Sequence, residues 1–191
     1  MNNSKTRKIV ITALMIALML VLQLTGVGLI KLGVVNITFY CTIIAIGTLV
    51  LGWKSGVTLG AAFTAISLWS ALQAPSALVA PLMAASVPMV CLMSFLPRIL
   101  VPLVTYFLHG ALVKANVNDK LAIAISAAAG SLTNTVLYLG LMLVGYAVTV
   151  ADYAGLLTTV GSIALAAGLP EAAAAAIVST PVVVALKKIY K

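Results

Sequence analysis

Two charged residues, Arg98 and Glu171, stand inside stretches of the chain that are otherwise apolar. A charged side chain in hydrocarbon is costly and rare, so it is a candidate for function wherever it occurs. Both residues fall in the part of their segments that we assign to the outer half of a membrane. Two interpretations, which are not exclusive, stay open: a buried Arg98–Glu171 ion pair, or contact between Arg98 and a ligand carboxylate. The forked guanidinium suits a carboxylate because it donates two parallel hydrogen bonds.

An amide inside an apolar run forms the second candidate. Asn134 lies within Gly130-Ser-Leu-Thr-Asn-Thr135, and an amide in hydrocarbon needs hydrogen-bond partners. Gly130, Asn134 and Tyr138 share one face of a helix, at positions i, i+4 and i+8. This face predicts either a polar ligand site or a hydrogen bond between helices.

Three further polar or aromatic residues lie toward the outer side. Trp69 and Gln73 are four residues apart at the end of an apolar segment, where they are expected to line a pocket mouth or to anchor the helix at the membrane interface. Asn36 is expected to cap the N-terminus of the next helix, and it also faces the outer side. His109 is expected to be a hydrogen-bonded structural histidine.

The residues needed for catalysis are scarce. The chain has three acidic residues, one histidine and two cysteines, Cys41 and Cys91, which we expect to be buried, unpaired thiols. We therefore expect no catalytic residue and no metal site, because enzymes need clustered acids, histidines or metal ligands. A phosphate-binding Gly-Lys-Ser/Thr motif is absent from the sequence, so any ATP is expected to bind to another subunit.

The composition places these residues in lipid. Hydrophobic residues make up 63% of the 191 residues and charged residues 7%, whereas a soluble domain carries roughly 25% charged residues. The formal charge of +8 would suggest nucleic acid in a soluble protein, but here the basic residues stand at segment ends and report topology. Abundant Gly and Ala favour packed helices over a barrel. We predict an all-α membrane protein, with no nucleic acid as partner.

A single integral membrane domain, 1–191, with six transmembrane helices is expected. The predicted helices cover about 9–24, 37–51, 57–71, 96–113, 121–148 and 161–186. Residues 72–93 hold Pro75, Pro81 and Pro88 and no charge, which disfavours a simple spanning helix and predicts an apolar loop folded back over the protein, or a re-entrant cap.

The positive-inside rule then orients the chain. Six crossings place both termini on one side, and the segments on that side hold most of the basic residues: Lys5, Arg7, Lys8, Lys54, Lys114, Lys120, Lys187, Lys188 and Lys191. The opposite loops hold only Lys31, while Arg98 belongs to the outer end of a helix. Both termini are therefore expected in the cytoplasm.

The first predicted helix carries two small residues spaced four apart. Ala13 and Ala17 share a face, where they allow another helix to approach closely, either within this bundle or from another subunit.

Several short motifs, in order along nearly the whole chain, resemble those of one family. They are Ala13-Leu-Met-Ile-Ala17, Val34-Val-Asn-Ile-Thr38, the Gly52-Trp-Lys-Ser-Gly56 turn, Phe95-Leu-Pro-Arg-Ile-Leu100, Gly130-Ser-Leu-Thr-Asn-Thr135 and Gly168-Leu-Pro-Glu171. In this respect the chain resembles the substrate-binding S components of energy-coupling factor (ECF) vitamin transporters, and is most similar to the pantothenate-specific branch. Trp53 departs from the pattern, because a Pro is expected there in close relatives.

The resemblance implies a vitamin-binding subunit, in the plasma membrane of a prokaryote, that has no enzymatic activity of its own. It implies docking on a transmembrane coupling subunit through Ala13 and Ala17, with two cytoplasmic ATPases that hold ATP and Mg, and import by toppling of the whole subunit in the bilayer.

For pantothenate, the resemblance and the chemistry together assign the carboxylate to Arg98. The hydroxyls and the amide are assigned to Asn134, Gln73 and Asn36, and the apolar walls to Trp69 and Tyr138. Two alternatives stay open: an S component for another vitamin such as cobalamin, and a self-sufficient channel or facilitator for small solutes.

Overall fold

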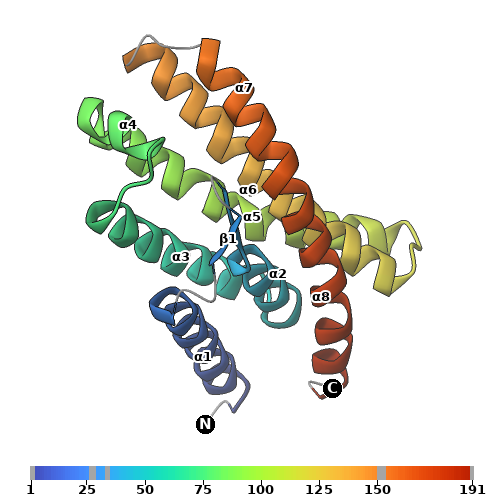
Figure 1. Cartoon of the computed structure of the whole chain (residues 1–191). Helices are drawn as coiled ribbons and strands as arrows, with labels where there is room; N and C mark the ends of the chain where they lie inside the picture. The colour runs from blue at the N-terminus through green and yellow to red at the C-terminus, as the bar shows by residue number, and fades with distance from the viewer. Residues whose placement is uncertain (1–2, 26–28, 33–34, 150–153, 190–191) are drawn as a thin grey trace.

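The computed structural model describes residues 3–25, 29–32, 35–149 and 154–189, and this part of the chain is a bundle of helices (Figure 1). The expected all-α membrane fold is confirmed. The helices are α1 (Asn3–Thr25), α2 (Tyr40–Leu51), α3 (Trp53–Gln73), α4 (Val79–Ala85), α5 (Val87–Lys114), α6 (Asp119–Thr149), α7 (Ala154–Ile163), a π-helical turn η1 (Ala164–Gly168) and α8 (Leu169–Ile189). A short hairpin, β1 (Leu29–Leu32) and β2 (Val35–Thr38), joins α1 to α2.

Five helical segments in the described chain are long and apolar enough to cross a membrane: Lys5–Thr25, Trp53–Gln73, Val87–Lys114, Asp119–Thr149 and Leu157–Ile189. The remaining apolar helix, α2, has 12 residues, which at 1.5 Å per residue is too short to cross about 30 Å of hydrocarbon alone. Residues 40–48 of α2 are all buried, because α3, α5, α6 and α8 pack around it. The predicted span 37–51 is therefore the central helix of the bundle.

The hairpin changes the expected start of α2. Strands β1 and β2 pair antiparallel, with Lys31 opposite Asn36, and β2 contacts η1 and α8. The predicted N-cap at Asn36 is wrong, since the residue before α2 is Phe39 and Asn36 lies in β2. β-branched Val35, Ile37 and Thr38 on either side of Asn36 favour this extended backbone.

Residues 72–93 are not the predicted loop. Within this stretch α3 continues to Gln73, α4 forms one short helix, and α5 begins at Val87. Pro88 stands in the first turn of α5, where a helix tolerates proline because that N–H has no partner inside the helix. The prolines stand between helices or near the starts of helices, at Pro75, Pro81 and Pro88, and do not prevent the helices from forming.

The last span is one long, interrupted helix. Helix α7 begins before the expected residue 161, and η1 joins it to α8 without a break. The π-helical turn lies directly before Pro170, whose nitrogen cannot donate the regular helical hydrogen bond. Glu171 follows in the first turn of α8, so this interruption places a carboxylate inside the bundle.

Close backbone contacts set the register of α3 against α5. A Cβ at Gly60 would overlap the carbonyl oxygen of Arg98, so only glycine allows this approach. Pro102 stands four residues after Arg98 and has no N–H, so that carbonyl lacks its usual helical donor. The contact brings Ser67, two turns along α3 from Gly60, beside the Arg98 side chain.

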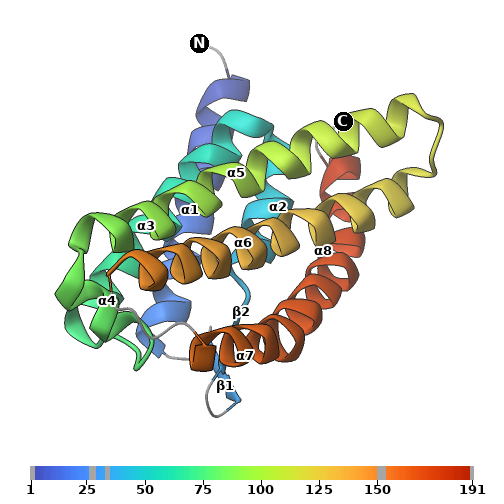
Figure 2. The same cartoon turned by 90° about the horizontal axis from the view of Figure 1, so that it is seen from above.

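One end of the bundle gathers polar groups from three helices. Asp119 at the start of α6 lies 3.3 Å from Nε2 of His109 on α5 and 3.0 Å from Nζ of Lys187 on α8. The beginning of α1 and the end of α8 lie on the same side of the molecule in both views, as the prediction of both termini in the cytoplasm requires (Figures 1 and 2). This end carries Lys187, one of the basic residues assigned to the cytoplasmic side.

Candidate ligand pocket

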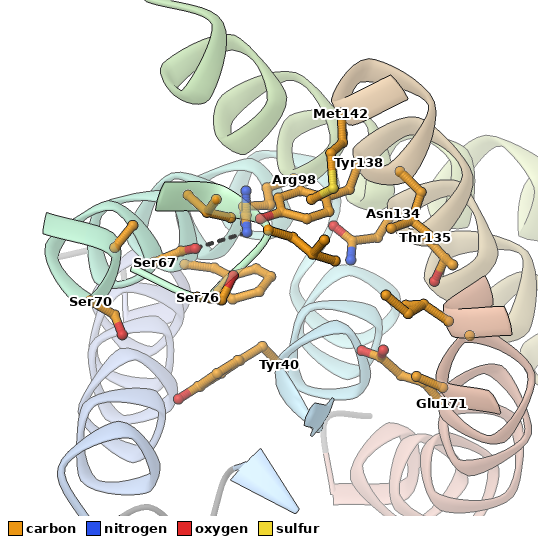
Figure 3. A pocket seen from close by; sticks show the side chains of 18 of the residues that line it. Tyr40, Ser67, Ser70, Ser76, Arg98, Asn134, Thr135, Tyr138, Met142 and Glu171 are labelled. Carbon is orange, nitrogen blue, oxygen red and sulfur yellow. Dashed lines mark hydrogen bonds between the residues drawn. The ribbon is translucent and has the colours of Figure 1, made fainter. Parts of the chain in front are cut away.

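A cavity of about 320 Å³ opens among α1, α2, α3, α5, α6 and α8, beside α4, at the end of the bundle away from the two termini. This volume is at the lower end of the roughly 300–1,000 Å³ that small-molecule sites occupy. The walls combine apolar side chains with polar and charged ones, and the polar and charged lining residues are Gln23, Tyr40, Ser67, Ser70, Ser76, Arg98, Asn134, Thr135, Tyr138 and Glu171 (Figure 3).

Arg98 enters the pocket between two aromatic rings. Its guanidinium carbon lies 4.6 Å from the centroid of the Phe63 ring and 5.2 Å from that of Tyr138. Nη2 donates a hydrogen bond of 2.9 Å to the hydroxyl oxygen of Ser67, and Nη1 donates to the carbonyl oxygen of Ser94. Ring faces and neutral oxygens thus hold a side chain that is only 5% exposed.

Two polar atoms of this wall have no hydrogen-bond partner among the described residues. They are Nε of Arg98 and Oδ1 of Asn134, both buried. A buried polar group without a partner is destabilising, and most such groups in folded proteins are satisfied by protein, water or ligand. The pocket therefore presents a donor and an acceptor to a polar solute.

Glu171 lines the same pocket from the start of α8 and is 6% exposed. Glu171 and Arg98 both belong to the described part of the chain, and no ion pair joins them. The expected buried ion pair is not formed, because aromatic rings and neutral oxygens hold Arg98 on another wall of the pocket.

A chain of hydrogen bonds closes the side of the pocket between α1 and α3. The Tyr40 hydroxyl donates to Oε1 of Gln23 at 2.8 Å, and Nε2 of Gln23 donates to the hydroxyl oxygen of Ser70 at 3.3 Å. The Tyr40 ring also packs on Phe63, with 4.8 Å between centroids. These contacts fix one wall from three helices that are distant in sequence.

The segment between α3 and α4 covers another side. Ser76 and Leu78 line the pocket there, and the Tyr146 hydroxyl on α6 donates a 2.6 Å hydrogen bond to the Leu78 carbonyl oxygen. This bond ties the outer connection to the bundle.

The structure brings together three of the six predicted ligand-binding residues: Arg98, Asn134 and Tyr138 line one cavity. Gly130 shares their helix face, but it packs against Thr105 of α5, where a Cβ would overlap the hydroxyl. The side chain of Asn36 lies outside the part of the chain that the structure describes, so its predicted contact stays a prediction.

Trp69 and Gln73 do not line the cavity. Both are exposed, and Trp69 is 65% exposed. The neighbouring face of α3 lines it instead, through Phe63, Ser67 and Ser70. Their spacing of four and three residues marks one helix face, a signal in the sequence that small serines make easy to overlook.

The other residues that the sequence analysis considered lie outside the pocket or do not form a metal site. Ala13 and Ala17 are exposed on α1, so they do not serve packing within this chain. Cys41 is buried and Cys91 is exposed, a correction to the expectation that both are buried, and both are free thiols. In the described part of the chain, no three His, Cys, Asp or Glu side chains gather in a way that could hold a metal ion.

The fold and the pocket define a class, namely a multi-pass membrane protein with a pocket lined by polar and apolar side chains. The sequence profile of the family described as "ECF transporter, substrate-specific component" matches residues 7–184. The chain belongs to this family, as its motifs predicted, and is a multi-pass protein of the bacterial plasma membrane. The pantothenic acid transporter PanT of Lactococcus lactis subsp. cremoris (strain MG1363) is 31% identical over 198 residues, which cover 98% of this chain and 97% of that protein.

Proposed function

We propose that this chain is the pantothenate-binding component of an ATP-driven ECF importer. The observation that carries the proposal is the cavity beside Arg98, whose guanidinium is buried without a carboxylate partner among the described ion pairs. Similarity to a pantothenic acid transporter over nearly the full length of both proteins supports this choice of ligand.

The chemistry of pantothenate matches the walls of the cavity. Its carboxylate suits the guanidinium of Arg98, which retains N–H groups beyond the two that bind Ser94 and Ser67. Its amide and hydroxyls suit Asn134, whose Oδ1 accepts no hydrogen bond from the described residues. Its apolar centre suits the ring faces of Phe63 and Tyr138.

The size of the cavity favours pantothenate over cobalamin. A cavity of about 320 Å³ fits a small, flexible acid, whereas a corrinoid is several times larger than the small molecules that such sites enclose. Cobalamin binding would require the walls to move apart.

Import requires partners that this chain does not supply. We place ATP and Mg in two cytoplasmic ATPases and the contact with the transmembrane coupling subunit at Ala13 and Ala17. These alanines support the placement because they are small and exposed on α1. Toppling of the whole subunit in the bilayer would carry the pocket inward, and the scarcity of charge on the apolar helices favours such a movement.

Calorimetry of the purified, detergent-solubilised chain with pantothenate and a panel of vitamins tests the ligand. Tight binding of one pantothenate per chain is expected. Binding of a different vitamin alone would reassign the pocket, and binding of none by folded protein would overturn the proposal.

Uptake by cells tests the coupling. Ala13→Trp should abolish uptake while the purified variant still binds ligand, because a bulky side chain blocks close helix approach on an exposed face. Leu20→Trp, at another exposed position of α1, is the matched control. ATPase subunits should co-purify with the unaltered chain, and a channel that works alone would show neither result.

A further inference from the structure

Opposite charges stand on different walls of the pocket. Arg98 comes from the middle of α5 and Glu171 from the first turn of α8, and both side chains are buried. Figure 3 shows them on opposite sides of the cavity. The cavity therefore has a cationic side and an anionic side.

Both charged side chains line the cavity, where a ligand can contact them. Three of the five guanidinium N–H groups remain after the bonds to Ser94 and Ser67, and one of them, at Nε, is buried without a partner among the described residues. The Glu171 carboxylate lines the cavity, and its two oxygens can only accept hydrogen bonds. One wall offers donors and the other offers acceptors.

A ligand with one carboxylate then has a preferred direction. In a cavity of low dielectric, a carboxylate near Glu171 is repelled, whereas near Arg98 it is attracted. A ligand hydroxyl near Glu171 can donate a charge-assisted hydrogen bond, which is stronger than a neutral one. The two walls favour the same orientation.

We infer that the pocket holds its ligand with the carboxylate on Arg98 and the hydroxyl-bearing end toward Glu171, which makes Glu171 a determinant of specificity. This inference rests on the proposed function and assigns to Glu171 the recognition of hydroxyl donors. Glu171 also excludes ligands that carry a second negative charge at the hydroxyl end, such as a phosphorylated form of the same molecule.

The test compares three ligands in three proteins by calorimetry. The ligands are pantothenate, pantothenol, in which an uncharged alcohol replaces the carboxylate, and the analogue of pantothenate that lacks the primary hydroxyl. The proteins are the unaltered chain, Arg98→Gln and Glu171→Gln. Ratios of affinity within one variant matter, because they remain meaningful even if a substitution lowers the fraction of folded protein.

The unaltered chain should bind pantothenol about 30-fold more weakly than pantothenate, because a hydrogen bond to a charged group is lost. Arg98→Gln should reduce that ratio to about 3 or less and keep the preference for the primary hydroxyl. Glu171→Gln should do the opposite: it should remove most of the hydroxyl preference and keep the preference for the carboxylate. Arg98→Lys, which keeps the positive charge, should preserve a preference for pantothenate.

Other outcomes overturn the inference in distinguishable ways. Tighter pantothenate binding by Glu171→Gln would place the ligand carboxylate near Glu171 and reverse the orientation. Ratios that neither substitution changes would remove both residues from recognition while the proposed function stands. Failure of the unaltered, folded chain to bind pantothenate would overturn the proposed function and this inference together. Asp119→Asn, an acid-to-amide change outside the pocket, should leave all ratios unchanged.

Discussion

Charged side chains of opposite sign lie on different helices at two places in the described chain, and they contact each other directly at only one of them. At the end assigned to the cytoplasm, Asp119 contacts both His109 and Lys187 directly, and the Asp119 side chain is 52% exposed. In the outer pocket, Arg98 and Glu171 are buried and no ion pair joins them.

The difference separates structural charges from recognition charges. Near water, an ion pair between helices is easily formed and contributes little energy, so it serves packing at the helix ends. Inside the bundle, a direct Arg98–Glu171 pair would satisfy both groups and leave little for a solute. With Arg98 held by aromatic rings and serines, the same two charges face a cavity instead.

The largest expected effect comes from the cationic wall. Arg98→Gln should weaken pantothenate binding about 100-fold, because a charge-assisted hydrogen bond and its electrostatic attraction are lost in a buried site. Lys187→Gln, which removes a positive charge from the other place, should leave the affinity unchanged. Calorimetry of both variants checks this, and similar losses in the two would mean that net charge rather than the pocket governs binding.

The contact that positions Arg98 should matter next. Gly60→Ala places a Cβ against the Arg98 carbonyl oxygen, so α3 and α5 must separate, and the free energy of unfolding should fall by about 1–3 kcal/mol. Gly110→Ala on α5 meets nothing within 4 Å and should be neutral or stabilising by up to about 1 kcal/mol. Thermal unfolding in detergent compares the two, and equal stability would show that the close approach at Gly60 is not needed.

A smaller effect is expected at the cytoplasmic end. Asp119→Asn removes the contacts with His109 and Lys187, which should lower the free energy of unfolding by about 1 kcal/mol or less. Added salt should reduce the difference from the unaltered chain, because it screens exposed charges. Denaturation at low and high salt measures the loss of stability and its dependence on salt. A loss of ligand affinity in this variant would contradict the claim that the charges at the cytoplasmic end take no part in ligand binding.

The smallest effect tests which face of α3 lines the pocket. Trp69→Ala should change pantothenate affinity by about twofold at most, because the side chain lies outside the cavity. Ser67→Ala, on the adjoining face, should weaken binding several-fold more, since it removes the hydrogen bond that orients Arg98. The reverse order of the two effects would assign the ligand to the other face.

Most of what could be predicted about the fold and the pocket followed from the composition and from isolated polar residues. Long apolar runs between basic ends leave few alternatives to membrane helices, and a buried Arg98 or Asn134 has few explanations besides a partner or a ligand. These residues therefore stood out, and the structure places them on one cavity.

The remainder depends on contacts that sequence patterns do not record. Gln23 stands near the end of α1, and only the hydrogen bond from Tyr40 across the bundle makes it part of the pocket. Ser67 and Ser70 are small and give little signal in the sequence. The larger Trp69 and Gln73 therefore led to a prediction of the wrong face of α3 as the pocket wall. The hairpin that contains Asn36 has four-residue strands, too short for an alternating pattern to distinguish them from a helix end.

The most direct measurement of the central claim is an experimental structure of the purified chain with pantothenate bound. The expected result is one ligand in the cavity, with its carboxylate within hydrogen-bonding distance of the Arg98 guanidinium and its hydroxyl end facing Glu171. A ligand bound outside this cavity would contradict the claim, and so would one whose carboxylate points away from Arg98.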